Sequence, residues 1–310
     1  PYLQYKTSTL NPVSWETDRR NFFGSYRGYH NPRALDIEKL EQHEVEGKDA
    51  IGSFEWKLNL SAKSTETWSC VLGLTPRKNG DEEPWKNFQS DLYVKNALDK
   101  TREYWKNRTG KTQVNIPDKD IQHTINTWAP CQISVNNWFG RAPSFWHSSQ
   151  GYKGFRDACQ DTLGILPVDT DHARKNIKHL LSFTYESGLN SHRTPRCEWS
   201  ADRSENADDP LWVPLALDGY LKETGNWKFL EEKVGYLDSD KGSSILEHMI
   251  KGINYVLNRR GPNDLPLIRG GDWNDALDNI GGNGQAESVF IGKTVTHRFP
   301  RNCRKNMRPH

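Results

Sequence analysis

The chain has 310 residues, a formal net charge of +2 and 34% hydrophobic residues, with a mean hydropathy of −0.87. The near-neutral charge and the even spread of basic residues along most of the chain argue against a nucleic-acid partner or an anionic membrane surface. No apolar run reaches the length that a membrane-spanning helix needs. Twelve tryptophans supply the amphipathic aromatic side chains that carbohydrate-binding proteins use.

The cysteines form no recognisable disulfide or metal pattern. They are an odd number at wide spacings, and none belongs to a Cys-x-x-Cys pair. We therefore expect reduced thiols, buried as small residues, in a cytoplasmic protein without a metal ion or cofactor. The five are Cys70, Cys131, Cys159, Cys197 and Cys303. Because the sequence begins with Pro1, we also expect it to be a fragment.

Residues 1–83 are predicted to form β structure. Residues 52–60 (Gly-Ser-Phe-Glu-Trp-Lys-Leu-Asn-Leu) alternate apolar and polar side chains, and residues 66–74 have the composition of a following strand. Two strands are not stable alone, so both must pair with further strands. Residues 84–116 are then predicted to form a helical linker, because apolar residues follow Pro84 among charged ones.

From residue 117 to residue 293 the pattern is helical. The first helix has Asp118 as its cap and carries Ile121, Ile125 and Trp128 at helical spacing. Aspartate before the first turn and glycine after the last are common helix ends. On this basis three more helices are predicted, which begin at Asp171, Asp209 and Ile245 and end near Gly188, Gly225 and Gly261.

The last stretch, residues 294–310, breaks this pattern. It has no helical stripe and is rich in Arg, Lys and His. One interpretation is an arm that binds nucleic acid, since basic runs neutralise phosphates. We favour a truncated or out-of-frame gene, because it also explains why the helical pattern stops soon after Phe290.

Residues 269–278, Arg-Gly-Gly-Asp-Trp-Asn-Asp-Ala-Leu-Asp, concentrate chemical groups in one short stretch. Glycines free the backbone for tight turns, carboxylic acids can protonate a glycosidic oxygen, and an indole can pack on a pyranose ring. The alternative is an ordinary solvated acidic loop. A calcium loop is excluded, because counting from Asp272 places Leu277 where the EF-hand needs glycine and Asn283 where it needs glutamate.

A second cluster lies upstream at residues 154–161, Gly-Phe-Arg-Asp-Ala-Cys-Gln-Asp. Together with Gly-Asp-Trp-Asn-Asp at 271–275, it resembles the inverting disaccharide phosphorylases of glycoside hydrolase family 94. That family includes cellobiose and chitobiose phosphorylases and the phosphorylase-like part of cyclic β-1,2-glucan synthases. Residues 15–19 and 31–35 are similar to the end of the family's N-terminal β-sandwich, so the resemblance covers residues 11–292.

The resemblance implies a mixed fold. Its parts are an incomplete β-sandwich over residues 1–83, a helical linker over 84–116 and the first half of an (α/α)6 catalytic barrel over 117–293, with 294–310 as an aberrant tail. It also implies a homodimer for the full-length protein. The family's histidine and Thr-Gly phosphate ligands match no position here, so we expect the fragment to be inactive alone.

The activity that the resemblance implies is inverting phosphorolysis of a β-linked glucoside, with inorganic phosphate as co-substrate and α-glucose 1-phosphate as product. A glycosidic bond breaks through an oxocarbenium-like transition state, so the leaving oxygen needs a proton. Phosphate is already the nucleophile, so one general acid suffices, and Asp275 resembles that acid by its position in the motif. Trp273 would pack against the sugar at the cleavage point.

Further substrate contacts are implied by the same motifs. Arg156 and Asp157 would hold sugar hydroxyls by charge-assisted hydrogen bonds, unless they form a buried ion pair between two helices. Gln160 and Asp161 would either touch sugar or support these contacts. Arg141 lies where the family places an arginine that grips phosphate.

Several alternatives remain open. Residues 150–153, Gln-Gly-Tyr-Lys, lack the additional sugar-contacting arginine of cellobiose- and chitobiose-type members and look closer to the β-1,2-glucan branch. An inverting hydrolase would need a second carboxylate, for which Asp208 or Asp209 can be nominated. A non-catalytic carbohydrate-binding remnant is the third hypothesis. Core packing is the better prediction for Trp128, Trp138 and Trp146.

Overall fold

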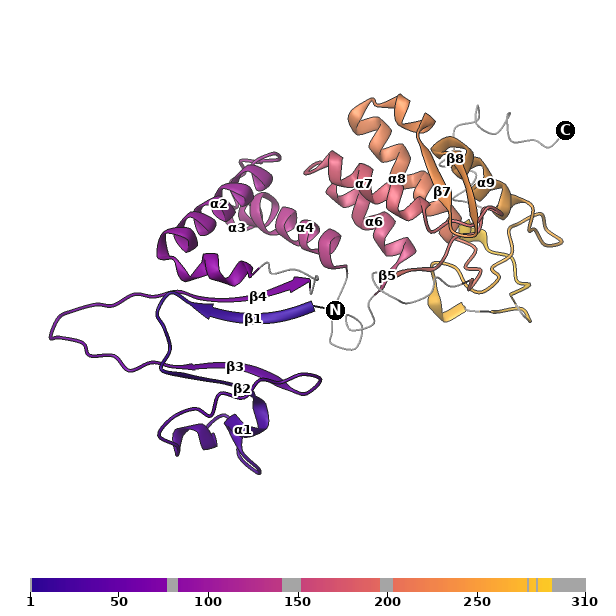
Figure 1. The fold of residues 1–310 in the computed structure, drawn as a ribbon. Helices are drawn as coiled ribbons and strands as arrows, with labels where there is room; N and C mark the ends of the chain where they lie inside the picture. The colour runs from indigo at the N-terminus through magenta and orange to yellow at the C-terminus, as the bar shows by residue number, and fades with distance from the viewer. Residues whose placement is uncertain are drawn as a thin grey trace. The chain divides into compact units, whose positions relative to one another are not determined.

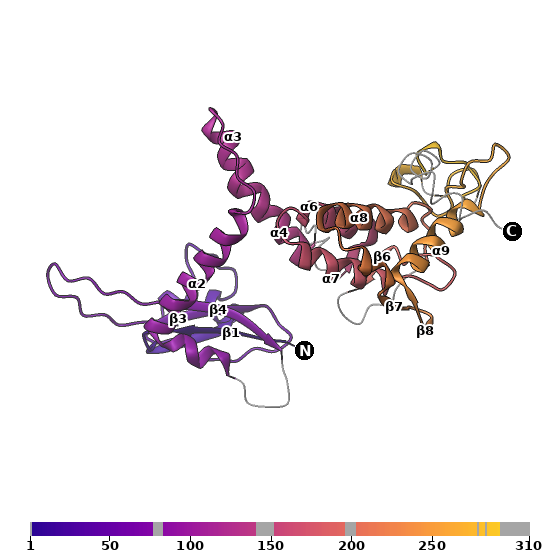
Figure 2. The same cartoon turned by 90° about the horizontal axis from the view of Figure 1, so that it is seen from above.

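The structure, a computed structural model, describes residues 2–76, 83–140, 152–195, 203–277, 279–282 and 284–291. The chain divides into two compact units, residues 1–104 and 105–310. Figures 1 and 2 show the elements of both units from two directions. Several predictions fall outside the described residues and stay predictions: those for Arg141, Trp146, Cys197, Cys303 and the tail 294–310.

The first unit is built on two antiparallel pairs of strands (Figure 1). β1 (Tyr2–Ser8) pairs with β4 (Cys70–Pro76), and β2 (Ser14–Asp18) pairs with β3 (Ala50–Glu55). Both predicted strands therefore exist, and each pairs with an earlier segment of the chain. A short helix, α1 (Arg19–Phe23), and a 3-10 turn, η1 (Arg33–Leu35), follow β2.

The predicted bounds of these strands are wrong. The first ends at Glu55 instead of residue 60, and the second begins at Cys70 instead of residue 66. The chain between them uses its aromatic residues in side-chain contacts: Trp56 Nε1 donates to the carbonyl of Leu10 at 3.0 Å, and the Trp56 ring lies 5.6 Å from that of Trp68. Aromatic residues favour strands, but here they pack outside the ladders.

A helix does occupy the predicted linker segment. After the 3-10 turn η2 (Pro84–Gln89), α2 (Asp91–Thr109) crosses from the first unit into the second. Asp91 stands in its first turn and Lys106 and Arg108 in its last, an order of charges that complements the helix dipole.

The next helix runs in three segments: α3 (Lys119–His123), the π-helical turn η3 (Thr124–Trp128) and α4 (Ala129–Phe139). Asp118 caps it as predicted, because its side chain accepts hydrogen bonds from the amides of Asp120 and Ile121 at 3.0 Å.

The apolar face predicted for this helix is not buried. Ile121, Ile125 and Trp128 are 52%, 42% and 56% exposed, so core packing of Trp128 is wrong. The helix buries polar groups instead: Asn126 binds both main-chain atoms of Val114, and Asn137 donates to the carbonyl of Asp161. Satisfied polar contacts therefore decide the inward face.

The core of the second unit lies among α6 (Phe155–Ile165), α7 (Thr170–Leu181), α8 (Asp209–Thr224) and α9 (Ile245–Leu257). Figures 1 and 2 both show α6, α7 and α8 side by side. The predicted starts at Asp209 and Ile245 are confirmed. Fully buried members of this core include Phe155, Ile165, Ile177, Leu181, Ala216, Phe229 and Ile245.

The ends of these helices show which signals are reliable. Gly225 ends α8 with a left-handed φ of 64°, as predicted. The cap predicted for α7 is wrong, because Asp169 rather than Asp171 accepts a hydrogen bond from the His172 amide, at 2.9 Å. That helix also ends at Leu181, well before Gly188.

Short strands interrupt the region predicted to be helical. β5 (Tyr152–Gly154) pairs with β6 (Arg193–Pro195), and β7 (Lys233–Tyr236) pairs with β8 (Ser239–Ser244). The sequence pattern does not indicate these strands, because β8 contains no apolar residue and β5 and β6 have only three residues each. The mixed fold class is confirmed, whereas a wholly helical second unit is not.

The cysteine prediction holds only in part. Cys159 is buried in the core, but Cys131 is half-buried and Cys70 is exposed. All three are free thiols. Across the part of the chain that the structure describes, no helix combines enough length with enough apolar character to cross a membrane.

Candidate active site

The loop after α9 carries the motif at residues 269–278, and backbone hydrogen bonds join it to the segment that precedes α8. Asn206 forms isolated bridges with Arg269 and Gly271, and the Ala207 amide donates to the Gly271 carbonyl at 2.9 Å. The chain passes so close that a Cβ on Gly270 would overlap the carbonyl oxygen of Ser204. Glycine is therefore required at position 270.

Asp272 shapes the turn that presents the rest of the motif. Its buried side chain accepts from the Asn274 amide through Oδ1 and from Ser288 Oγ through Oδ2, both at 2.8 Å. The turn leads into the 3-10 helix η5 (Asp275–Leu277). The backbone of Asp275 therefore begins a defined turn, while its side chain lies outside the described part of the structure.

Trp273 projects outward from this turn. It is 57% exposed, and its ring centroid lies 5.9 Å from that of Phe290, with 31° between the ring planes. An exposed indole beside a second aromatic ring offers a flat apolar surface of the kind that binds sugar rings.

The second motif forms the start of α6. The Phe155 amide donates to the His192 carbonyl at 2.8 Å, where β5 and β6 pair, and the Phe155 ring enters the core. Asp157 folds back over the first turn, since a Cβ on Gly154 would come 2.8 Å from its Oδ2. Asp157, Gln160 and Asp161 are all partly exposed.

Arg156 joins the two motifs. It is only 8% exposed, and its Nη1 donates to the main-chain carbonyl of Asp272 at 2.7 Å and to Oδ2 of Asp208 at 3.1 Å. The same Oδ2 accepts from the indole nitrogen of Trp212 at 2.8 Å. One guanidinium thus holds the start of α8 and the loop together. The ion-pair alternative was stated for Arg156 and Asp157, whereas the buried ion pair in the structure joins Arg156 to Asp208.

Two neighbouring carboxyls are buried at the start of α8. Burial raises the pKa of Asp208, although Arg156 acts in the opposite direction. Burial also raises the pKa of Asp209 to about 7, against the effect of His192. His192 Nδ1 lies 2.9 Å from Asp209 Oδ2 and 2.9 Å from the side-chain nitrogen Nδ2 of Asn206.

The charges of this cluster are incompletely compensated. Oδ1 of Asp208 and Oδ1 of Asp209 are buried and find no hydrogen-bond partner among the described residues. Buried carboxyls with raised pKa values are more common at functional sites than in ordinary cores. Neither residue reaches the surface, since they are 1% and 0% exposed.

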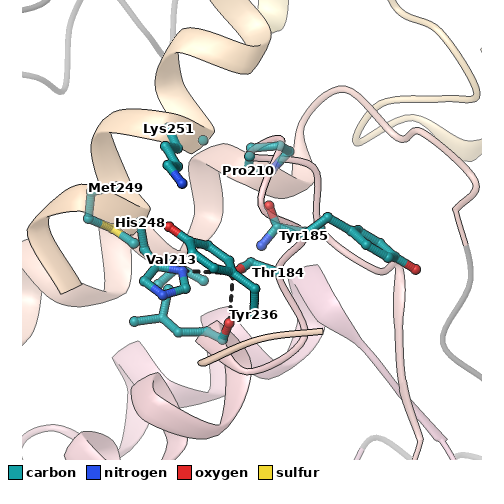
Figure 3. A pocket seen from close by; sticks show the side chains of 12 residues that line it. Thr184, Tyr185, Pro210, Val213, Tyr236, His248, Met249 and Lys251 are labelled. Atoms are coloured by element: carbon teal, nitrogen blue, oxygen red, sulfur yellow. Dashed lines mark hydrogen bonds between the residues drawn. The ribbon is translucent and has the colours of Figure 1, made fainter. Parts of the chain in front are cut away.

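Two hollows formed by described residues of the second unit lie away from these motifs. One is a cavity of about 10 Å³ under Tyr236 and His248, where Thr184 Oγ1 lies 2.8 Å from His248 Nδ1 (Figure 3). It has room for roughly one water molecule, not for a sugar. A wider hollow of about 520 Å³ is lined by Lys106, Lys111 and polar neighbours, and no predicted site residue borders it.

The only group of possible metal ligands in the described residues lies in the first unit. Glu16, Glu41 and His43 place ligand atoms within 4.8 Å of one another. Their charges are already met, because Arg33 binds both oxygens of Glu41 and His43 Nδ1 lies 2.9 Å from Glu16 Oε2. This group does not favour a metal ion over the ion pairs present.

Sequence reasoning thus finds the two motifs but not what connects them. Arg156 donates to the main chain of the loop at 269–278. Arg141 and the side chain of Asp275 lie outside the described part of the structure. Asp208 was nominated only for a rival mechanism, and Trp212 and His192 were missed. The one available signal was the pair of adjacent aspartates before Pro210 at a helix start.

Comparison with known families and proteins agrees with the family resemblance of the two motifs. Residues 104–304 match the glycosyl hydrolase 94 superfamily, catalytic domain, and residues 2–91 match the glycosyl hydrolase 94 supersandwich domain. The first match continues past Lys293 into the basic tail.

Three curated relatives illustrate the similarity. Solabiose phosphorylase of Paenibacillus borealis is 27% identical, over 94% of this chain and 36% of its own length. Cyclic beta-(1,2)-glucan synthase NdvB of Rhizobium meliloti (strain 1021) is 27% identical, over 90% of this chain and 10% of its own length. N,N'-diacetylchitobiose phosphorylase of Vibrio proteolyticus is 24% identical, over 93% of this chain and 39% of its own length. The chain therefore spans between 10% and 39% of the length of these relatives.

Proposed function

The chain belongs to the glycosyl hydrolase 94 superfamily, and we therefore propose that it carries the sugar-binding and acid-donating part of an inverting glycoside phosphorylase. The substrate class is a β-linked glucoside. A phosphate oxygen attacks the anomeric carbon as the glycosidic bond breaks, and the leaving oxygen takes a proton from the enzyme. The products are α-glucose 1-phosphate and the shortened acceptor sugar.

One observation carries this proposal. Arg156, in the motif at 154–161, donates to the main chain of Asp272, in the motif at 271–275. The two stretches are more than a hundred residues apart, yet Arg156 Nη1 lies 2.7 Å from the carbonyl oxygen of Asp272. A chance acidic loop would have no reason to sit against a second motif of the same kind.

The roles follow from positions in the motifs. We assign Asp275 as the general acid and Trp273 as the apolar platform for the sugar ring at the cleavage point. Asp157, Gln160 and Asp161, which are partly exposed, hold the sugar hydroxyls, whereas the buried Arg156 holds the loop through its contacts with Asp208 and Asp272. Arg141 binds phosphate, for which a guanidinium offers two parallel donors.

The same residues support a finer view of the architecture. We propose that α4 and α6 to α9 belong to an (α/α)6 barrel, with the loop at 269–278 on its catalytic face. The sequence and positions of these helices are compatible with such a ring, since α6 packs against α4, α7 and α8, and α8 packs against α9.

The hydrolase alternative is less compatible with this site. An inverting hydrolase needs a carboxylate that activates water. Asp208 and Asp209 are buried, and their second oxygens bind Arg156 and Trp212 or His192. A carboxylate enclosed in this way cannot present a water molecule to a sugar in the open loop.

The test is phosphate-dependent turnover by the full-length gene product. β-1,2-, β-1,3- and β-1,4-linked glucobioses are incubated with and without inorganic phosphate, and phosphorus NMR identifies the anomer formed. We expect α-glucose 1-phosphate only when phosphate is present, and Arg141→Ala should raise KM for phosphate more than KM for the sugar. Glucose release at the same rate without phosphate would establish a hydrolase, and binding without turnover would establish a non-catalytic sugar-binding protein.

A further inference from the structure

We infer that Asp208 and Trp212 are positioning residues, which act through Arg156 to hold the loop that carries Trp273 and Asp275. Neither residue belongs to the two sequence motifs. The chain of contacts runs from the Trp212 indole nitrogen to Asp208 Oδ2, from there to Arg156 Nη1, and on to the carbonyl of Asp272.

The geometry ties each contact in this series to a fixed partner. Asp208 Oδ2 accepts two donors from different elements, at 2.8 and 3.1 Å, so neither can turn away without leaving a buried charge less compensated. The Nη1 that binds Asp208 also donates to the main-chain oxygen of Asp272, at 2.7 Å. A main-chain contact fixes the path of the backbone whatever side chain follows.

The place of that contact explains why it matters. Asp272 directly precedes Trp273 and lies three residues before Asp275, so their Cα atoms are at most about 11 Å apart. Asp272 also accepts hydrogen bonds from Ser288 Oγ and from the Asn274 amide. With the one from Arg156, three hydrogen bonds hold the start of the turn. Supporting contacts of this kind commonly set the orientation of groups that touch substrate.

The position of Asp208 fits this role better than a capping role. It occupies the N-cap position of α8 but makes no capping hydrogen bond. An aspartate at this position would normally accept from the amides of the first turn. Here its carboxylate accepts from the Trp212 indole, one turn further along α8, and from Arg156 of α6, which in turn donates to the loop at 269–278.

The inference is tested with Asp208→Asn and Trp212→Phe. The first removes the charge and keeps the size, and the second removes only the indole donor and keeps an aromatic ring. Asp218→Asn is the matched control on the same helix, since Asp218 is exposed and pairs only with Lys222 among the described residues. Trp227→Phe, at an exposed tryptophan in η4 (Trp227–Glu231), controls for the loss of an indole.

Hydrogen–deuterium exchange on the 310-residue chain gives the first readout. We expect amides of residues 271–277 to exchange at least about tenfold faster in both test variants, with exchange in α7 unchanged and with both controls like the unaltered chain. Unchanged exchange at 271–277 in Trp212→Phe, which perturbs packing least, overturns the inference. Faster exchange throughout the unit would also overturn it, by showing a general role in stability.

Kinetics of the full-length protein give the second readout, which rests on the proposed function. We expect kcat for phosphorolysis to fall about 10–100-fold in both test variants, while KM for phosphate changes by less than about twofold. Unchanged kcat contradicts the inference. If the unaltered protein forms no glucose 1-phosphate, the proposed function fails, and the exchange experiment still decides the positioning role.

Discussion

At its N-terminal end helix α8 buries charged side chains, whereas its later turns bury apolar ones. Asp208 and Asp209 meet Arg156 and His192 at the start of the helix. Further along, Leu217 and its neighbours join the apolar core of α6, α7 and α9. The apolar end stabilises the unit through burial, while the charged end connects segments that are far apart in the sequence.

This difference indicates that the two ends of the helix have different structural roles. Well-packed apolar residues would stabilise the N-terminal end at least as well as a buried ion pair does, so the charges are not explained by stability. We explain them by the loop at 269–278, to which Arg156 connects the start of the helix. Changes at the two ends should therefore separate into effects on chemistry and effects on folding.

The largest effect is expected for Asp275→Asn in the full-length protein. An amide cannot give a proton to the leaving oxygen, so kcat should fall by about 10²–10⁴-fold while sugar binding remains. Steady-state kinetics and calorimetric titration with the sugar measure the two quantities. The control is Asp264→Asn, at an exposed aspartate that pairs with Arg260. More than about a tenth of the original activity in Asp275→Asn would contradict the assignment.

The apolar end was largely predictable from the sequence, because local periodicity carries the information. The starts of α8 and α9 and the end of α8 at Gly225 follow from caps and spacing. The charged end was not predictable in the same way. Arg156 and Asp208 are separated by 52 residues, and nothing in either local pattern shows that they meet. Likewise, only tertiary contacts decide that Ile121 and Ile125 face outward.

The next effect in size concerns the apolar core. Ile177 is fully buried on α7, so Ile177→Ala should lower the free energy of unfolding by about 2–5 kcal/mol through lost burial and the cavity left behind. Urea denaturation of the 310-residue chain measures it. Ile125→Ala is the control, because that side chain is 42% exposed and its loss should cost under about 1 kcal/mol. Similar losses in both variants would show that the core is elsewhere.

A smaller effect is expected from the pH dependence of the charged end. The pKa of Asp209 is raised by burial from 3.8 to about 7, so the folded chain keeps a proton that the unfolded chain releases. The bound proton therefore stabilises the folded chain fully at a pH below the pKa that Asp209 has in the unfolded chain. This contribution is lost as the pH rises through the pKa of Asp209 in the folded chain. Because His192 shares this hydrogen bond, we expect about 1–2 kcal/mol between roughly pH 5 and pH 8.

Asp209→Asn should remove this dependence, because an amide does not titrate in that range. The melting temperature of the unaltered chain should fall as the pH rises from about 5 to about 8, and that of the variant should fall less. Asp218→Asn, at an exposed position on the same helix, should keep the original slope. Equal slopes for the unaltered chain and Asp209→Asn would show that Asp209 does not hold the proton.

The smallest effect is expected at the ion pair between Lys222 and Asp218, on the exposed face of α8. Its atoms are 2.6 Å apart, closer than those of Arg156 and Asp208, yet both side chains are solvated. Water screens the attraction, and holding two long side chains in one geometry costs entropy, so Lys222→Ala should change the free energy of unfolding by less than about 0.5 kcal/mol. Urea denaturation at low and high salt measures it. A loss above about 1 kcal/mol would mean that distance, rather than burial, governs the strength of ion pairs on this helix, and the contrast between its two ends would then need another explanation.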